Sequence, residues 1–444
     1  MRSFLCVAAK PCLYLFFLLG FSYASAAPAL SCQVSSADPN KASSSATQAT
    51  TTAYHLSPEK YEKAVAYSRA GYGLYFVSVF WNIAMILWLL RLKVFAALRD
   101  FAEAKARNRA LQATIFVPIL FLLLAVLNLP LRIYWHHLSL GYQQSIEPWG
   151  PWLWDWTKAE LLTIGLALVV VFLLFALIRS KPRAWWFYAW LGAIPLALFL
   201  VFITPWYIDP LFNKFQPLQE KYPQLVESIA TLTDHAGYPI PRSRIFLMEA
   251  SAKTNAINAY VTGLGASKRI VIWDTSIRKA APDELLYIVG HEMGHYVLGH
   301  VVKGFNFFLA MLFMALFLAY RLLEWLVLRF GSNWGIRGPS DWASLGVLLL
   351  LLQVMSFFGE PIGNAFSRRI EHAADLYGLE LIYGMIPNAN EVAARSFQVL
   401  GEEDLEDPEP SKFIVFWLYS HPPLNERLLF AHDFKPAQTK PGSR

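Results

Sequence analysis

The 444-residue sequence predicts a mainly α-helical, polytopic membrane protein with a small α+β domain divided between two hydrophilic segments. Only 16% of its residues are charged and 56% are hydrophobic. A globular domain, by comparison, carries about a quarter charged residues. Six apolar segments are each long enough to cross a bilayer. A histidine pair at helical spacing lies in the longer hydrophilic segment.

The N-terminal 71 residues differ in composition from the rest of the chain. Residues 1–27 are predicted to form a signal peptide or an additional first span, because basic residues, an apolar run and small residues follow one another. Residues 28–71 are predicted to form a linker and a short helix. The first part of this range is rich in Ser, Thr, Ala and Gln, which is typical of a flexible linker. All three cysteines are near this end, so no disulfide or cysteine-ligated metal is expected beyond residue 32. They are Cys6, Cys12 and Cys32.

The six predicted spans fall into two groups. Residues 72–207 contain four spans and residues 305–363 contain two. The expected boundaries are approximately 72–90, 113–135, 160–178, 185–207, 305–328 and 344–363. The hydrophilic segments 208–304 and 364–444 are each expected to contribute one half of the α+β domain.

Lys and Arg residues predict the orientation of these spans. The connection after the first span carries six of them between residues 91 and 112, and the connection after the third carries three within residues 179–183. Because cytoplasmic connections are enriched in positive charge, both hydrophilic segments are expected on the extracytoplasmic side of an inner, plasma or ER-type membrane. The formal net charge of +6 then reflects topology, so the lipid bilayer is an expected partner and nucleic acid is not.

Both hydrophilic segments contain recognisable secondary-structure signals. The elements expected in the first are an amphipathic helix at Lys221–Ala236, strands at Arg244–Met248 and Lys268–Trp273, and a helix at Pro282–His300. The second segment is expected to be mostly helical. Its acidic run Glu402–Glu409 is expected to be a solvated loop.

His291-Glu292-Met293-Gly294-His295 is a HExxH motif on the second expected helix. Histidines four residues apart lie on one helix face and can bind the same cation. Glu292 points about 100° away around the helix, where it can reach a metal-bound water without being a ligand. Burying two imidazoles and a carboxylate without partners would be costly in this apolar helix. The motif therefore predicts one catalytic zinc ion per chain, with Glu292 as the general base.

A catalytic zinc ion needs a third protein ligand. The extended three-histidine motif is absent because His300 is one position too early, so His300 is expected on the helix surface or behind the ligands. Two acidic candidates remain. Glu324 lies in the fifth span, one turn after Arg321, and Glu371 follows the sixth span. Glu371 is favoured because Asp375 shares its helix face and can fix the tautomer of a ligating histidine.

The order of these motifs resembles that of the type I CAAX prenyl proteases, multispan zinc metallopeptidases of peptidase family M48. HEMGH is followed by two spans and then by SRRIEHAAD at residues 367–375. The likeness extends from about residue 185 to about residue 430. Further similar segments are IDPLFNKF at 208–215, NAYVTG at 258–263, KRIVIWDT at 268–275 and SHPPLNER at 420–427.

The resemblance implies a barrel of membrane helices that encloses a large chamber, with zinc at one end. It implies that zinc is bound by three residues, namely His291, His295 and Glu371. Glu292 is then both base and acid, and Asp375 orients a ligand. The resemblance also places His421 and Arg427 near the developing oxyanion. From the residues alone, His421 could equally be structural, and Arg427 could pair with Glu426 or Asp375.

The resemblance further implies a substrate-binding strand region that contains Asn258, Tyr260, Ile270 and Ile272. Asn258 would contact the substrate backbone, and the strand Arg269–Trp273 could pair with an extended substrate. The expected function is hydrolysis of peptide bonds in CAAX-type or other membrane-associated protein substrates. One alternative is a quality-control protease of the same family that degrades misfolded or stalled membrane proteins. A remote alternative is a multispan transporter or scaffold whose HExxH motif is vestigial. The sequence sets no expectation for the oligomeric state.

Overall fold

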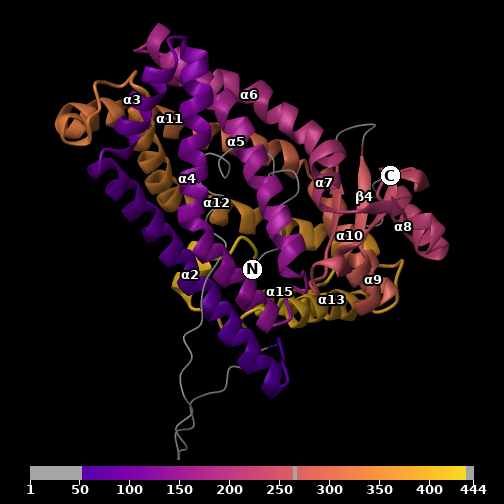
Figure 1. The fold of residues 1–444 in the computed structure, drawn as a ribbon. Helices are drawn as coiled ribbons and strands as arrows, with labels where there is room; N and C mark the ends of the chain where they lie inside the picture. Colours follow the sequence, from indigo (N-terminus) through magenta and orange to yellow (C-terminus); the bar gives the residue numbers. More distant parts are fainter. Residues whose placement is uncertain (1–52, 264–267, 437–444) are drawn as a thin grey trace, which may run out of the picture.

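The computed structural model describes residues 53–263 and 268–436, and its elements are labelled in Figure 1. Long helices fill one side of the molecule, and a small sheet with shorter helices lies at the other side (Figure 1). The predicted mainly helical architecture is therefore confirmed. The signal peptide or first span predicted at residues 1–27 lies outside the described residues.

The described residues contain six helices that are long and apolar enough to cross a membrane. The number of predicted spans is confirmed, and the chain is a multi-pass integral membrane protein. The helices are α2 (Pro58–Arg91), α4 (Arg109–Gly141), α5 (Trp149–Ser180), α6 (Trp185–Ile203) with its continuation to Phe212, α11 (His300–Trp334) and α12 (Leu345–Ile382).

Helix α2 is longer than a membrane requires. Its 34 residues extend about 51 Å, whereas the hydrocarbon core is about 30 Å thick. The helix begins at Pro58, and the side chain of Ser57 caps it by accepting a hydrogen bond from the Lys60 amide. The short helix predicted within residues 28–71 is helical from Pro58, but the predicted boundary at residue 72 is wrong, because residues 58–71 continue directly into the span.

Helix α3 (Val94–Lys105) connects α2 to α4 at the end of the molecule farthest from the sheet (Figure 1). Arg99 on α3 forms a buried ion pair with Asp341, in the connection between α11 and α12. Arg99 also donates to the Gly335 carbonyl at 3.0 Å. These contacts fasten the first and last spans together at this end.

A four-stranded sheet forms the centre of the small α+β region. Its strands are β1 (Phe215–Pro217), β2 (Ile245–Met248), β3 (Ala259–Thr262) and β4 (Arg269–Trp273), in the order β1-β2-β4-β3. The strands β2 and β4 are parallel, and the other two pairs are antiparallel. The two strands predicted from sequence are confirmed as β2 and β4. Because β4 lies between β2 and β3, both of its edges are already paired.

Three helices of the first hydrophilic segment accompany the sheet. They are α8 (Pro223–His235), α9 (Asp274–Lys279) and α10 (Pro282–Val297). The predicted helix at 282–300 is wrong at its C-terminal end, because α10 stops at Val297 and α11 begins at His300. Gly299 between them has φ +67°, a left-handed conformation that costs glycine little.

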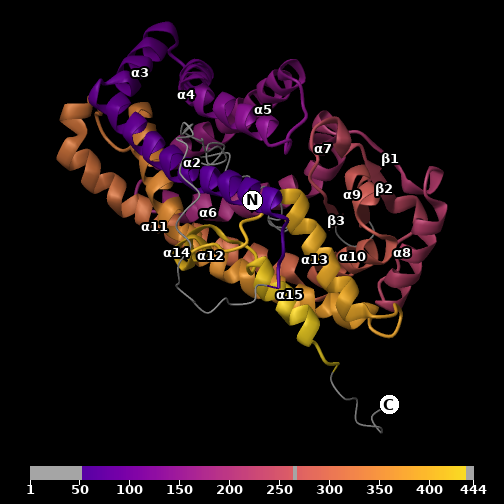
Figure 2. The ribbon, with the colours of Figure 1, turned by 90° about the horizontal axis from the view of Figure 1, so that it is seen from below.

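The second hydrophilic segment packs against the first. It contains α13 (Ala389–Asp404), α14 (Lys412–Leu418) and α15 (Leu424–Asp433). Figure 2 shows α13 next to α10, and α15 packs against α13. A single buried apolar cluster takes residues from both segments. It includes Leu218, Ile245, Met293, Leu379, Phe397 and Leu428.

The acidic run Glu402–Glu409 is not the solvated loop that was expected. Helix α13 continues into it as far as Asp404, and Asp407 is buried, where it accepts a hydrogen bond from the Tyr72 hydroxyl at 3.3 Å. Glu402 forms an ion pair with Lys60 at 2.8 Å. The prediction was wrong because the N-terminal part of α2 packs against this run, a long-range contact that no local pattern indicates.

Candidate metal centre

Helix α10 carries the HExxH motif into the interior. Pro282 occupies its first turn, and the Glu284 carboxylate accepts a hydrogen bond from the Ala281 amide at 2.8 Å, which satisfies one helix-terminal donor. From His291 to His295 every residue of the helix is buried. His291, Glu292 and His295 expose no more than 7% of their surface.

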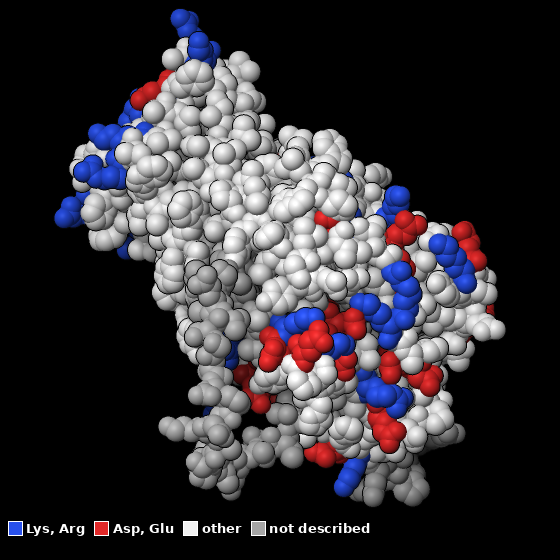
Figure 3. All heavy atoms as spheres, turned by 60° about the horizontal axis from the view of Figure 1, so that its bottom comes forward, with Lys and Arg blue, Asp and Glu red and all other residues white. Residues whose placement is uncertain are grey.

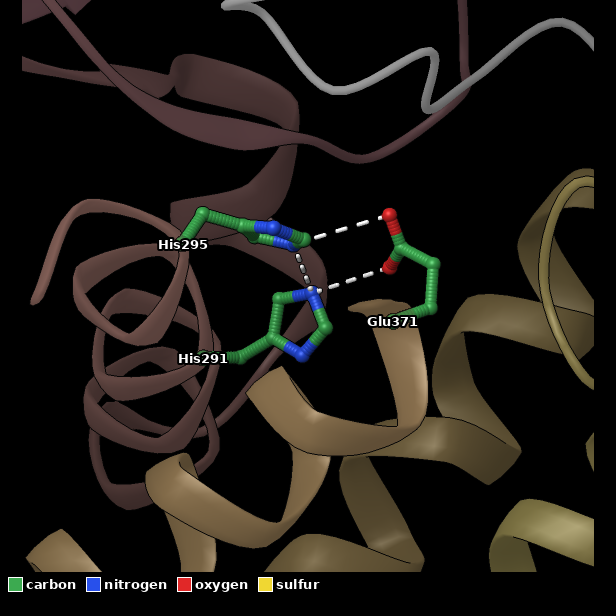
Figure 4. Close-up of side chains that lie close together, drawn as sticks. All are labelled: His291, His295 and Glu371. Atoms are coloured by element: carbon green, nitrogen blue, oxygen red, sulfur yellow. Dashed lines mark hydrogen bonds and ion pairs between the residues drawn. The ribbon is translucent and has the colours of Figure 1, made fainter. Parts of the chain in front are cut away.

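Glu371 on α12 meets the two histidines of α10. Figure 4 shows the three side chains pointing toward one another from these two helices. The Nε2 atoms of His291 and His295 are 3.1 Å apart. The Glu371 oxygens lie 3.3 Å from His291 Nε2 and 3.5 Å from His295 Nε2. One ligand atom from each residue lies within 4.8 Å of the others, so the three can share one metal ion.

The chemistry of these three side chains fits a divalent metal. Glu371 is 1% exposed, and neither of its oxygens accepts a hydrogen bond of normal geometry from the described residues. Buried carboxylate oxygens are seldom left without donors, so their arrangement suits a cation. Two imidazole nitrogens and one carboxylate form a ligand set used by catalytic zinc. The other candidate, Glu324, is an exposed residue of α11 and does not belong to this group.

Asp375 lies behind His291, one turn after Glu371. Its Oδ1 atom is 2.8 Å from His291 Nδ1, as expected for a residue that fixes the tautomer of a ligand. Burial disfavours the charged imidazolium, but the nearby carboxylates of Asp375 and Glu371 outweigh this effect, so the pKa of His291 is raised. The Nδ1 atom of His291 faces Asp375, and its Nε2 atom faces the other ligands.

Arg427 on α15 is directed at Asp375. Its Nε donates to Asp375 Oδ2 at 2.9 Å and its Nη2 donates to Oδ1 at 2.5 Å. Its guanidinium also lies 4.2 Å from the centre of the Phe397 ring. Arg427 therefore pairs with Asp375, one of the two partners that the residues alone had left open. It lies behind His291 and not beside the ligand atoms.

His300 supports the second histidine. It is 3% exposed, and its Nδ1 lies 3.1 Å from His295 Nδ1. Of the two positions expected for it, behind the ligands or on the helix surface, the structure shows the first. A neutral His300 can accept the Nδ1–H of His295, which directs His295 Nε2 toward the metal position.

His421 reaches the same centre from the loop between α14 and α15. Its Nε2 lies 3.1 Å from Glu371 Oε2, and its Nδ1 pairs with the Ser420 hydroxyl at 3.0 Å. Ser420 was not singled out from sequence, although it directly precedes the HPP motif. The side chain of His421 is 15% exposed, so it lies at the open side of a buried ligand group.

The predicted substrate-binding residues are divided between two strands. Ile270 and Ile272 on β4 are 1% and 0% exposed and belong to the core, so the prediction that they and β4 bind substrate is corrected. Asn258 and Tyr260 lie at β3, an edge strand whose outer side pairs with no other described strand. Asn258 is 5% exposed, and its Oδ1 has no hydrogen-bond partner among the described residues.

A close helix crossing brings the two parts of the centre together. A Cβ atom on Gly378 would lie 2.8 Å from the His291 amide nitrogen, so only glycine lets α12 approach α10 this closely. Sequence reasoning missed Gly378. Its only signal was a glycine one turn after Asp375, on a helix already expected to carry a ligand.

Comparisons with known proteins agree with this geometry. Residues 219–433 match the family model described as peptidase family M48. Residues 41–214 match the model described as CAAX prenyl protease N-terminal, five membrane helices. These matches, together with the possible metal ligands on α10 and α12, identify a membrane-embedded metalloprotease. The chain belongs to peptidase family M48, among its CAAX prenyl proteases.

Individual relatives support the same assignment. The Bacillus subtilis protein described as uncharacterized metalloprotease YhfN is 36% identical over 376 residues, which cover 85% of this chain and 86% of that protein. A human CAAX prenyl protease 1 homolog is 27% identical over 362 residues, covering 71% and 73% of the two chains. The crystal structure of S. mikatae Ste24p has the same fold, with a TM-score of 0.72 and 24% identity over 96% of this chain and 98% of that chain. The Bacillus subtilis and human relatives are both described as proteases, which does not favour the transporter or scaffold alternative.

Proposed function

We propose that this metalloprotease is a zinc-dependent endopeptidase that cleaves membrane-associated protein substrates, with one zinc ion bound by His291, His295 and Glu371. The observation that carries the proposal is the meeting of two imidazole Nε2 atoms and one buried carboxylate within 4.8 Å, next to Glu292. The hydrophilic segments 208–304 and 364–444 then act as two halves of one peptidase domain, because their apolar residues share one core.

Glu292 has the central catalytic role in this proposal. A bound zinc ion supplies Lewis-acid polarisation of the scissile carbonyl and lowers the pKa of a bound water to about 7. Glu292 takes the proton of the attacking water and returns it to the leaving amine. His421 donates a hydrogen bond to the developing oxyanion, an effect worth about 3 kcal/mol for a well-placed donor. Asp375 and His300 hold the two ligating imidazoles in the required tautomers.

The outer edge of β3, which pairs with no other described strand, is the proposed binding site for an extended substrate. An added strand would form main-chain hydrogen bonds with Ala259–Thr262 and would need little sequence preference. Helix α10 packs against β3, so a substrate on this edge lies close to the HExxH helix. The unpaired Oδ1 of Asn258 can accept a hydrogen bond from a substrate amide, which would remove the cost of leaving it unsatisfied.

Several polar side chains are buried within the bundle of spans. Polar residues inside a membrane face the bundle interior or a water-filled cavity. Here they occur on α2, α4 and α12, and each is less than 6% exposed. They are Ser78, Asn82, Asn128, Gln353 and Ser356.

The charge distribution supports an extracytoplasmic peptidase domain. Figure 3 shows Lys and Arg gathered at the end that carries α3, whereas the opposite end carries both signs of charge. Exposed residues at the α3 end include Lys93, Lys105, Arg107, Lys181 and Arg183. By the positive-inside rule this end is cytoplasmic, and the α10 end is outside, in an inner, plasma or ER-type membrane. This orientation favours substrates that reach the outer side of the membrane.

Purified protein in lipid nanodiscs tests the proposal. Glu292→Gln should lower kcat about 10²- to 10⁴-fold, because it removes the general base, while zinc content stays unchanged. Glu380→Gln, which changes an exposed glutamate of α12, should retain wild-type kinetics. Wild-type turnover by Glu292→Gln would rule out the proposed mechanism.

Three substrates separate the candidate substrate classes. They are a farnesylated CAAX peptide, the same peptide without its lipid, and an unfolded membrane-protein reporter. Cleavage of the farnesylated peptide alone identifies a CAAX-type protease, in agreement with the names of the relatives. Cleavage of the reporter alone identifies the quality-control activity that an extracytoplasmic site favours. Cleavage of none by the zinc-loaded protein contradicts the proposal.

A further inference from the structure

The segment that carries His421 is attached to α12 by hydrogen bonds. Arg368 lies three residues before Glu371, and its Nη1 donates to the Val415 carbonyl at 3.0 Å and to the Tyr419 carbonyl at 2.5 Å. One turn earlier, the Asn364 amide donates to the Trp417 carbonyl at 2.6 Å. Tyr419 is two residues before His421, so this attachment ends next to the proposed oxyanion donor.

Helix α14 itself is little buried, whereas Tyr419 directly after it is 3% exposed and its hydroxyl lies 2.9 Å from the Tyr72 hydroxyl. None of the seven residues of α14, all of which the structure describes, is buried, and Phe413 and Phe416 are more than half exposed. The last carbonyls of any helix have no partner within the helix and need donors from elsewhere. Arg368 supplies donors to one carbonyl in α14 and to one directly after it, and together with Asn364 it joins this helix to the metal-binding helix.

One helix therefore positions both groups. Asn364, Arg368 and Glu371 follow one another at spacings of four and three residues, so they lie on neighbouring parts of one face of α12. Glu371 holds the metal position, and Arg368 holds the chain that brings His421 Nε2 to 3.1 Å from Glu371. The planar guanidinium can bridge two carbonyl oxygens, whereas an ammonium group cannot reproduce this fork.

We propose that Arg368 is a positioning residue, which fixes His421 beside the reacting carbonyl by holding the Val415 and Tyr419 carbonyl oxygens. The inference rests on the proposed function in one respect, the role of His421 as oxyanion donor. Arg368 itself touches neither substrate nor metal. Its effect should therefore appear in kcat through His421, and metal binding should not change.

Steady-state kinetics of Arg368→Ala tests this role. We expect kcat to fall about 10- to 100-fold, somewhat less than the loss of an oxyanion donor, while KM changes less than about twofold and zinc content is unchanged. Arg369→Ala is the matched control, because its side chain is exposed on the same helix and should leave kcat unchanged. Arg368→Lys should keep the wild-type melting temperature and recover part of kcat, since it retains charge and one donor.

A double-mutant cycle with His421→Ala separates positioning from general stability. If Arg368 acts through His421, Arg368→Ala/His421→Ala should turn over no more slowly than His421→Ala alone. Losses that multiply would overturn the inference, as would loss of zinc in both Arg368 variants. None of these outcomes for the Arg368 variants changes the loss of kcat expected for Glu292→Gln. Unchanged kcat in Glu292→Gln would instead contradict the proposed function itself.

Discussion

At the scale of single residues, Asp375 connects two charged partners. It is fully buried, and it contacts His291 through Oδ1 and Arg427 through both oxygens. A buried ion pair with good geometry contributes less to net stability than to fixing positions, because desolvation offsets much of its attraction. The row Arg427–Asp375–His291 therefore serves to orient one metal ligand.

Asp375→Asn should weaken zinc binding about 10- to 100-fold, the usual effect of losing the partner of a ligating histidine. The amide keeps the shape of the side chain but can present its NH₂ group to His291 or Arg427. Competition with a chelator of known affinity measures the change. Asp433→Asn, at an exposed position, is the control. The double variant Asp375→Asn/Arg427→Gln removes both buried charges. Unchanged zinc affinity in Asp375→Asn and in this double variant would show that Asp375 does not orient His291.

The ligand residues were predictable because helix geometry is local. The spacing of His291 and His295 puts both on one face of any α-helix, and Asp375 follows Glu371 by one turn for the same reason. The environment of His300 was not predictable in this way. It depends on the break at Gly299, which turns the chain so that His300 faces His295, and on the crossing at Gly378. Both features arise from tertiary packing.

At the scale of elements, the sequence predicted strands but misplaced the open edge. The run Ile270-Val271-Ile272 is continuously apolar, which is typical of a strand covered on both faces. That signal indicated a central strand, yet β4 was expected to pair with substrate. The short strand β3 was not predicted as a separate element, and it takes the edge position because it pairs back onto β4. Strand order depends on long-range pairing, which no local pattern encodes.

The acidic run after α13 gives a pH-dependent prediction. Burial is the main cause that raises the pKa of Glu406 from 4.5 to about 7, with Asp404 and Asp407 contributing repulsion. The folded protein therefore keeps this proton up to about pH 7, whereas an unfolded chain releases it near 4.5. Stability should fall as pH rises between these two values.

Glu406→Gln should remove this loss of stability at higher pH. We expect the variant to melt a few degrees above wild type at pH 8 and to show no such gain at pH 4, since about 1 kcal/mol corresponds to a few degrees in domains of this size. Thermal unfolding followed at both pH values measures the difference. Glu409→Gln changes an exposed carboxylate of the same run and should melt like wild type at both. A constant difference between Glu406→Gln and wild type at all pH values would contradict the raised pKa.

At the scale of the whole molecule, the orientation in the membrane determines which substrates can arrive. Ser243 is exposed in the peptidase part, and Ser332 is exposed near the end of α11 at the opposite side. With Cys6, Cys12 and Cys32 replaced by serine, Ser243→Cys should react with an impermeant maleimide on intact cells. Ser332→Cys should react only after permeabilisation. The reverse pattern would place the peptidase domain in the cytoplasm and strengthen the case for a prenylated substrate.

The most direct test of the account is the zinc content of variants that change one ligand. The central claim is that α10 and the far end of the sixth span, α12, build one metal site, with Glu371 as the third ligand. Purified wild type and Glu324→Ala should each contain one zinc ion per chain, whereas His291→Ala and Glu371→Ala should contain almost none and cleave no peptide. Full zinc content and activity in Glu371→Ala would contradict the account.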